Sequence, residues 1–127
     1  MTAKETKSKH ILMIDDDITA LDIVSYLFEE RGYDVERCAD GFRALEYLET
    51  IKPDLILVDL RMPNIDGVQT VKKIREMGLA AVPIIAFTAV DDPDLHSEAL
   101  DAGCQEVLTK PCPAEKLVRY IKRYLPE

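Results

Sequence analysis

Acidic side chains, one threonine and one lysine follow the apolar runs of this sequence at the points where the runs end. Asp15, Asp16 and Asp17 follow ILMI, Asp59 follows LILV, Thr88 follows IIAF, and Lys110 follows VLT. If these runs are parallel strands, their carboxyl ends share the sheet edge at which open α/β sheets bind ligands. The sequence therefore predicts one site that combines several carboxylates with a hydroxyl and an amine.

These residue types predict phosphoryl transfer to an aspartate. Close packing of Asp15, Asp16 and Asp59 is unfavourable, because two unit charges about 4 Å apart repel by roughly 4 kcal/mol at an effective dielectric near 20. Mg²⁺ removes that repulsion, since it prefers hard oxygen ligands and phosphate oxygens. Thr88 and Lys110 supply donors for the remaining phosphoryl oxygens, and a carboxylate can attack phosphorus to form an acyl phosphate. Taken singly, each residue is explained by a solvated turn or a helix cap. Their order at consecutive strand ends favours the site.

The elements that must position these residues alternate between strand and helix patterns. Short apolar runs predict strands over residues 11–14, 55–58, 84–87 and 107–109, with a weaker and less buried strand over residues 34–38. The apolar positions with helical spacing are Leu21, Val24, Leu27 and Phe28, then Phe42, Leu45 and Leu48, then Val68, Val71, Ile74 and Met77. Gly78 is expected to end the third helix, and Pro93 and Pro113 to lie in the first turns of the fourth and fifth. This alternation predicts a doubly wound α/β fold with helices on both faces of a parallel sheet.

Composition indicates one ordinary globular domain. The chain has 127 residues, of which 47% are hydrophobic, and its 16 basic and 24 acidic residues give a net charge of -8. The acidic balance argues against a direct nucleic-acid binder, and no apolar run is long enough to predict a membrane span or a signal peptide. Three cysteines without metal-ligand spacing favour free thiols in the cytoplasm, where the protein is expected. We expect a single domain over residues 1–127 with a polar extension over residues 1–8.

From about Lys9 to Tyr124 the sequence resembles the receiver domains of two-component response regulators. Among these it is most similar in kind to the single-domain chemotaxis regulators. The segments that carry the resemblance are ILMIDDD, PDLILVDLRMPNIDG, PIIAFTA and EVLTKP. The resemblance implies a flavodoxin-like (βα)5 fold with strand order 2-1-3-4-5 and phosphorylation of Asp59. The metal ligands that it implies are Asp16 directly, Asp15 mainly through water, Asp59, and the main-chain carbonyl of Arg61. Thr88 and Lys110 are implied as phosphoryl contacts, and Met62-Pro63 with Asp66-Gly67 as the loop that shapes the site.

The resemblance also implies partners and local features. A sensor histidine kinase or a histidine phosphotransfer protein would be the phosphodonor, and an output protein would read the face formed by the fourth helix, fifth strand and fifth helix. The domain would catalyse only its own phosphorylation and dephosphorylation. A cis Lys110–Pro111 peptide and a trans Met62–Pro63 peptide are expected. Val107 stands where many receivers have a switching aromatic residue, so we expect the response to come from the loop over residues 90–93.

Two alternative functions and one question about the extent of the protein accompany this interpretation. Asp15, Asp17 and Thr19 also fit the D-x-D-x-T opening of haloacid-dehalogenase-like phosphatases, but the chain after Pro111 lacks the acidic pair which that family needs. A pseudo-receiver that binds partners without phosphorylation is disfavoured, because every expected site residue is present. The chain is either a stand-alone receiver or a receiver cut from a longer protein, and the sequence leaves both possibilities open.

Overall fold

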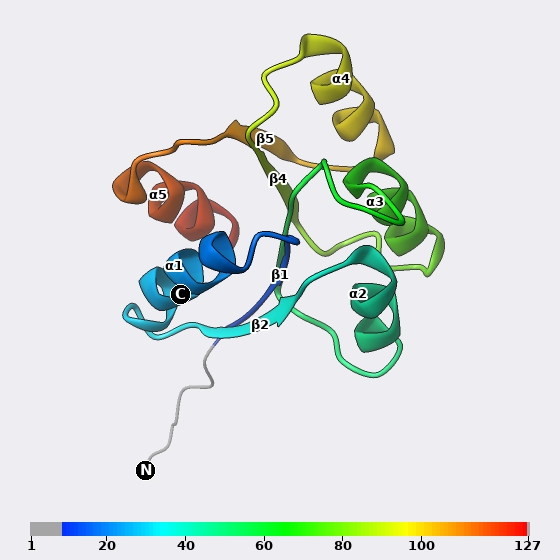
Figure 1. The fold of residues 1–127 in the computed structure, drawn as a ribbon. Helices are drawn as coiled ribbons and strands as arrows, with labels where there is room; N and C mark the ends of the chain where they lie inside the picture. Colours follow the sequence, from blue (N-terminus) through cyan, green and yellow to red (C-terminus); the bar gives the residue numbers. More distant parts are fainter. Residues whose placement is uncertain (1–8, 127) are drawn as a thin grey trace.

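Strands and helices alternate along the whole described part of the chain (Figure 1), which in this computed structural model is residues 9–126. The strands are β1 (His10–Ile14), β2 (Asp34–Cys38), β3 (Leu55–Val58), β4 (Ile84–Thr88) and β5 (Glu106–Thr109). The helices are α1 (Ile18–Glu29), α2 (Gly41–Leu48), α3 (Gly67–Glu76), α4 (Pro93–Ala102) and α5 (Ala114–Tyr124). Each predicted strand is therefore confirmed to within one residue. The predicted extension over residues 1–8 lies outside the described residues.

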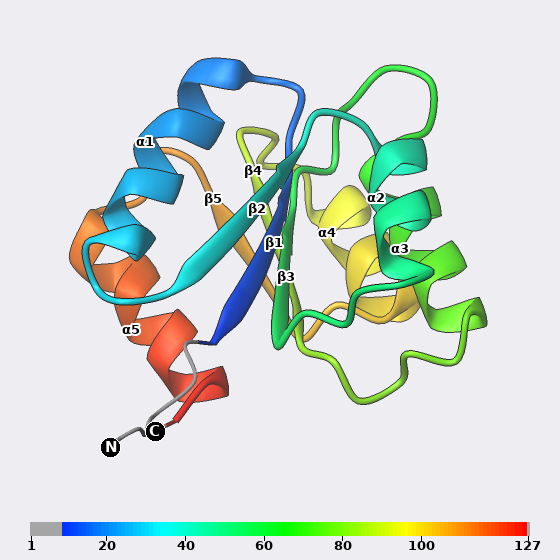
Figure 2. The same ribbon diagram turned by 90° about the horizontal axis from the view of Figure 1, so that it is seen from below.

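The strands form one parallel sheet in the order β2-β1-β3-β4-β5. Figure 2 shows α1 and α5 on one face of this sheet and α2, α3 and α4 on the other. The winding direction changes between β1 and β3, and such a switch point opens a crevice at the carboxyl ends of the two strands. The expected doubly wound fold and strand order are confirmed.

The sheet separates two apolar layers, because successive side chains of a strand point to opposite faces. In β1, Leu12 and Ile14 pack under α2, α3 and α4, whereas Ile11 and Met13 pack under α1 and α5. All four side chains are at most 2% exposed. Burial on both faces explains why β1, β3 and β4 are continuous apolar runs in the sequence. The edge strand β2 buries only Cys38, as its weaker pattern predicted.

Aspartates begin four of the described helices. The carboxylates that accept first-turn amide hydrogen bonds belong to Asp17 (α1), Asp40 (α2), Asp66 (α3) and Asp92 (α4). Such a cap typically contributes about 1 kcal/mol to stability. Pro93 is the first residue of α4, as predicted. Pro113 instead precedes α5 at the cap position, because its ψ of 141° is extended rather than helical.

Two side chains that we predicted to lie on apolar helix faces are exposed. Phe42 is 52% exposed and Met77 is 40% exposed. In the short helix α2 the buried positions are Gly41, Ala44 and Leu48, and the first two are small residues that a search for large apolar side chains passes over. Met77 lies after the last residue of α3, where the chain turns away from the helix. Gly78 follows with a φ of 90°, as its predicted role at the helix end requires.

Two local expectations concern the backbone. The Lys110–Pro111 peptide is cis, as expected. It is the one cis bond found within residues 9–126, so Met62–Pro63 is trans, which was also expected.

No helix formed by the described residues is long and apolar enough to cross a membrane.

Candidate functional site

The acidic residues meet where two neighbouring central strands end side by side. Ile14 of β1 is in register with Val58 of β3, so the residues that follow, Asp15 and Asp59, leave the sheet together. The Asp59 amide donates to the Ile14 carbonyl at 2.8 Å, and the Asp15 amide donates to the Cys38 carbonyl at 3.0 Å. Backbone hydrogen bonds to adjacent strands thus fix both aspartates.

The carboxylates of Asp15, Asp16 and Asp59 converge on one point. Each offers an oxygen atom, and these oxygens lie within 4.8 Å of one another. Oxygens around an octahedral Mg²⁺ are roughly 3 to 4 Å apart, so the cluster fits this ion after small side-chain movements. A donor set made only of hard oxygens also suits Mg²⁺ better than a softer metal. The role of the Arg61 carbonyl as a further ligand stays a prediction.

Asp17 does not belong to this cluster. Its carboxylate accepts hydrogen bonds from the amides of Thr19 and Ala20 at the start of α1. Its own amide donates to the Asp15 carboxylate at 2.9 Å, which helps to orient that side chain. The acidic triplet therefore divides into a helix cap and two residues that face the site.

Lys110 extends from the end of β5 toward the acidic cluster. Its Nζ lies 2.6 Å from Asp15 Oδ2 and 3.8 Å from Asp59 Oδ2. The ammonium group also lies 5.3 Å from the ring centroid of Phe87, the residue that precedes Thr88 in β4. Only 20% of the lysine side chain is exposed, so solvent screens these interactions weakly. The sequence predicted Lys110 but not its contact with Phe87, which depends on strand pairing.

Thr88 completes the group at the end of β4 and is fully buried. The Lys110 amide donates to its carbonyl at 2.7 Å, which ties the ends of β4 and β5 together. The Val90 amide donates to its hydroxyl oxygen at 3.2 Å. The structure therefore brings all four predicted strand ends into one site.

Burial raises the pKa of Asp59 above its ordinary value. The Lys110 charge opposes this shift, the Asp15 carboxylate adds to it, and hydrogen bonds from the Arg61 amide and the Thr88 side chain lower the pKa again. On balance the surroundings therefore disfavour the charged form of Asp59, and the Lys110 charge and the two hydrogen bonds offset only part of the penalty of burial.

The loop after Asp59 passes very close to the start of α3. The Gly67 amide donates to the Leu60 carbonyl at 3.0 Å, and a Cβ at Gly67 would lie 2.6 Å from the Leu60 Cα. Asn64 takes a φ of 71°, in the left-handed region. Asp66-Gly67 thus shapes the site as the resemblance implied, because only glycine allows this approach.

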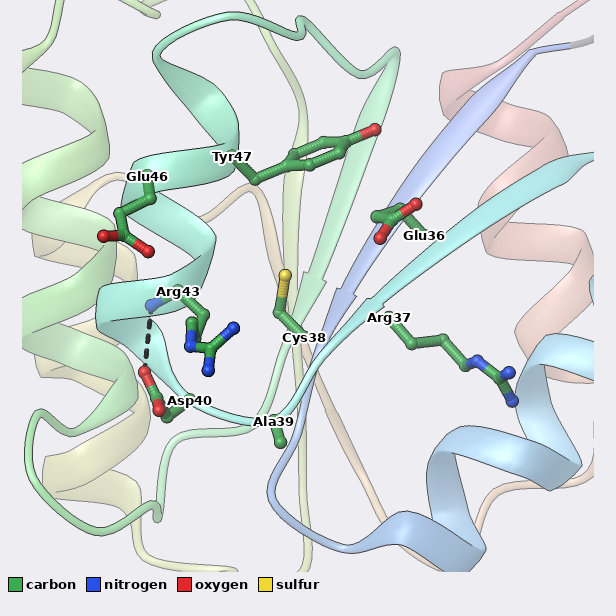
Figure 3. A pocket seen from close by; sticks show the side chains of 8 residues that line it. All are labelled: Glu36, Arg37, Cys38, Ala39, Asp40, Arg43, Glu46 and Tyr47. Atoms are coloured by element: carbon green, nitrogen blue, oxygen red, sulfur yellow. Dashed lines mark hydrogen bonds between the residues drawn. The ribbon is translucent and has the colours of Figure 1, made fainter.

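A separate hollow of about 600 Å³ lies between the end of β2 and α2 and does not include the acidic cluster. Figure 3 shows the Cys38 sulfur pointing into it, with Arg43 and Tyr47 of α2 nearby. Burial and the neighbouring Glu36 raise the pKa of the Cys38 thiol to about 11, so it is not an activated nucleophile. The chemistry of the site therefore lies at the strand ends and not in this hollow.

Comparison with known proteins agrees with this geometry. The family model of the response regulator receiver domain matches residues 11–122. The alkaline phosphatase synthesis transcriptional regulatory protein PhoP of Bacillus subtilis (strain 168) is 35% identical over 93% of this chain and 49% of its own length. The DNA-binding dual master transcriptional regulator RpaA of Synechocystis sp. is 33% identical over 91% of this chain and 48% of its own. The chain thus spans about half the length of these curated relatives.

Solved structures of similar size give the same result. A CheY-like receiver domain protein from Methanospirillum hungatei JF-1 has a TM-score of 0.90 and 28% identity, with 94% of each chain covered. The chemotaxis response regulator CheY4 of Vibrio cholerae has a TM-score of 0.86 and 30% identity, over 93% of this chain and 99% of its own. This chain belongs to the response regulator receiver family, a class of signalling domains. The family match favours this interpretation over the phosphatase alternative.

Proposed function

We propose that Asp59 is the phosphoacceptor and that it reacts in a Mg²⁺-dependent way. The observation that carries this proposal is the position of its carboxylate, which belongs to the acidic cluster and also lies 3.8 Å from the Lys110 Nζ. Asp15, Asp16 and Asp59, with the main-chain carbonyl of Arg61, would hold the metal. When bound there, Mg²⁺ supplies positive charge that offsets the carboxylates and the incoming phosphoryl oxygens.

The residues of the chain have separate roles in the transfer. An Asp59 oxygen attacks phosphorus, so an O–P bond forms while the bond from phosphorus to the donor nitrogen breaks in line with it. The Lys110 ammonium group neutralises charge on the phosphoryl oxygens, and the Thr88 hydroxyl donates a hydrogen bond to one of them. Burial of Thr88 and partial burial of Lys110 strengthen both interactions, because the local dielectric is lower than that of water.

The partners are part of the same proposal. We propose that a sensor histidine kinase or a histidine phosphotransfer protein is the donor and that an output protein binds the face formed by α4, β5 and α5. The domain catalyses only its own phosphorylation and dephosphorylation, and we propose one receiver domain over the whole chain. A cytoplasmic location is supported by three free cysteines, none of which forms a disulfide.

Intact-mass measurement after incubation with acetyl phosphate tests the phosphoacceptor. We expect one added phosphoryl group in the presence of Mg²⁺, loss of labelling when the cation is chelated, and loss of labelling in Asp59→Asn. The control Asp101→Asn removes an exposed aspartate of α4 and should label normally. Normal labelling of Asp59→Asn together with loss of labelling in Asp15→Asn would instead support the phosphatase alternative.

A further inference from the structure

A series of hydrogen bonds leads from the phosphorylation site to α4. The Val90 amide donates to the Thr88 hydroxyl oxygen at 3.2 Å, and His96 Nε2 lies 2.8 Å from the Val90 carbonyl. Both backbone groups of this single loop residue are therefore used, one toward the site and one toward the helix. His96 also lies in the first turn of α4, where its amide donates to the Asp92 carbonyl at 3.0 Å.

The chemistry of the acceptor requires a proton on one of the two ring nitrogens of His96. A carbonyl oxygen can only accept, so His96 Nε2 must carry a hydrogen atom. Both the neutral Nε2–H tautomer and the imidazolium satisfy this requirement. The contact therefore depends on the position of His96 and not on its charge.

We propose that His96 is a positioning residue that holds the β4–α4 loop through Val90 and thereby couples the Thr88 hydroxyl to α4. The proposal rests on phosphorylation of Asp59 as argued above. When the Thr88 hydroxyl turns toward a phosphoryl oxygen, the Val90 amide must follow its acceptor or lose it. The Val90 carbonyl then moves relative to His96, and the first turn of α4 responds.

The neighbouring strand offers no comparable polar connection. The side chain of Val107 in β5 is aliphatic and has no polar atom. It is half-buried and packs against the apolar layer that contains α4. A hydrogen bond has a narrow range of lengths and directions, so a small displacement of Thr88 alters it more than it alters an aliphatic contact. Linked hydrogen bonds also polarise one another. The His96–Val90–Thr88 series is therefore the direct polar route from the site to this helix within the described residues.

The NMR chemical shifts of the histidines test this proposal. If His96 had only a structural role, its signals would not respond to a phosphoryl mimic at Asp59. The sequence contains two histidines, and His10 lies at the amino end of β1, away from the strand ends that form the site. In the wild-type protein with Mg²⁺, addition of beryllofluoride as a phosphoryl mimic should shift the His96 Nε2–H and Val90 amide signals. The His10 imidazole signals should stay in place. Movement of the Thr88 signals without any movement at His96 would overturn the proposal.

Two variants test the same series by chemistry. In His96→Leu the donor is lost, and we expect the phosphoryl group on Asp59 to decay roughly two- to tenfold faster, which is the range that one neutral hydrogen bond accounts for. In His96→Gln the amide nitrogen can replace Nε2, so decay should return toward the wild-type rate. His10→Gln is the matched control and should decay as the wild type does.

The outcomes separate this proposal from the phosphorylation that it assumes. If the wild type gains no phosphoryl group and binds no beryllofluoride, the proposed function fails, and the role of His96 fails with it. If the wild type is labelled but His96→Leu and His96→Gln decay at the same rate, only the role of His96 is refuted. Should His96→Leu not fold, the wild-type NMR measurement still decides the matter.

Discussion

Replacing Lys110 by methionine should destabilise the protein strongly in the absence of Mg²⁺. The lysine lies 2.6 Å from Asp15 and 3.8 Å from Asp59, distances that correspond to about 6 and 4 kcal/mol of gross attraction at an effective dielectric near 20. Desolvation of the amine offsets much of this, and deletion of one partner of a buried ion pair costs about 3–5 kcal/mol. Because 20% of the Lys110 side chain is exposed, we expect a loss near the lower end, about 3 kcal/mol.

The size of this loss should depend on pH in a defined direction. The pKa of Asp59 is raised above its ordinary value of 3.8, first by burial, and Lys110 is the main cause that opposes the shift. Loss of the amine therefore raises this pKa further. A carboxyl group with a raised pKa in the folded state opposes folding above that pKa, and this cost disappears as pH falls through it toward the unfolded value. The destabilisation should thus be largest near neutral pH and shrink toward pH 4.

Urea denaturation followed by circular dichroism measures the effect at several pH values, without and with millimolar Mg²⁺. Lys116→Met is the matched control, because it removes the same charge from an exposed position on α5. Mg²⁺ should restore part of the loss in Lys110→Met, since it binds the folded acidic cluster and not the unfolded chain. Equal losses in the two variants, or a loss that does not change between pH 7 and pH 4, would refute this account of the site.

Three further predictions concern the site and the thiols. Gly67→Ala should lower the free energy of unfolding by about 2 kcal/mol, as overpacking does, because the new Cβ would clash with the Asp59 carbonyl oxygen and lie 2.6 Å from the Leu60 Cα. A loss that urea denaturation cannot resolve would contradict the close approach. The side chain of the half-buried Val90 offers no acceptor to orient a water molecule, so the phosphoryl group on Asp59 should be long-lived. Val90→Glu should accelerate its decay roughly tenfold, below the full effect of an ideally placed base. Unchanged or slower decay would contradict this role. Burial raises the pKa of the Cys38 thiol to about 11 and that of the Cys104 thiol to about 12. At pH 8 a disulfide reagent should therefore react only with Cys112 in the folded protein and with all three thiols in urea. Rapid modification of two or more thiols without urea would contradict this prediction.

The sequence predicted the strands and the four strand-end residues because each depends on a local pattern. A strand buried on both faces must be a continuous apolar run, and β1, β3 and β4 all are. Asp15, Asp59 and Thr88 directly follow such runs, and Lys110 follows the shorter, half-buried β5. Parallel pairing brings the ends of neighbouring strands together. Their convergence therefore follows from the order of the chain and from the rule for parallel sheets.

Helix faces were harder to predict where small residues are buried. In α2, Ala44 is fully buried while Phe42 is half exposed, because α3 packs closely on this helix and leaves room for small side chains. Leu48 is buried as its hydrophobicity indicates, and Phe42 is the exception. Only the packing of α2 against α3 shows which of its residues are buried.

Contacts between distant segments depended entirely on the tertiary structure. The Lys110 ammonium group meets the Phe87 ring because β4 and β5 are paired, and His96 reaches the Val90 carbonyl because the loop before α4 bends back over the helix start. Neither contact has a spacing or composition that marks it in the sequence. Local patterns of burial and turn chemistry determined the fold and the reacting groups of this protein. The orientation of those groups came from hydrogen bonds and packing between segments, whose geometry exists only after the chain has folded.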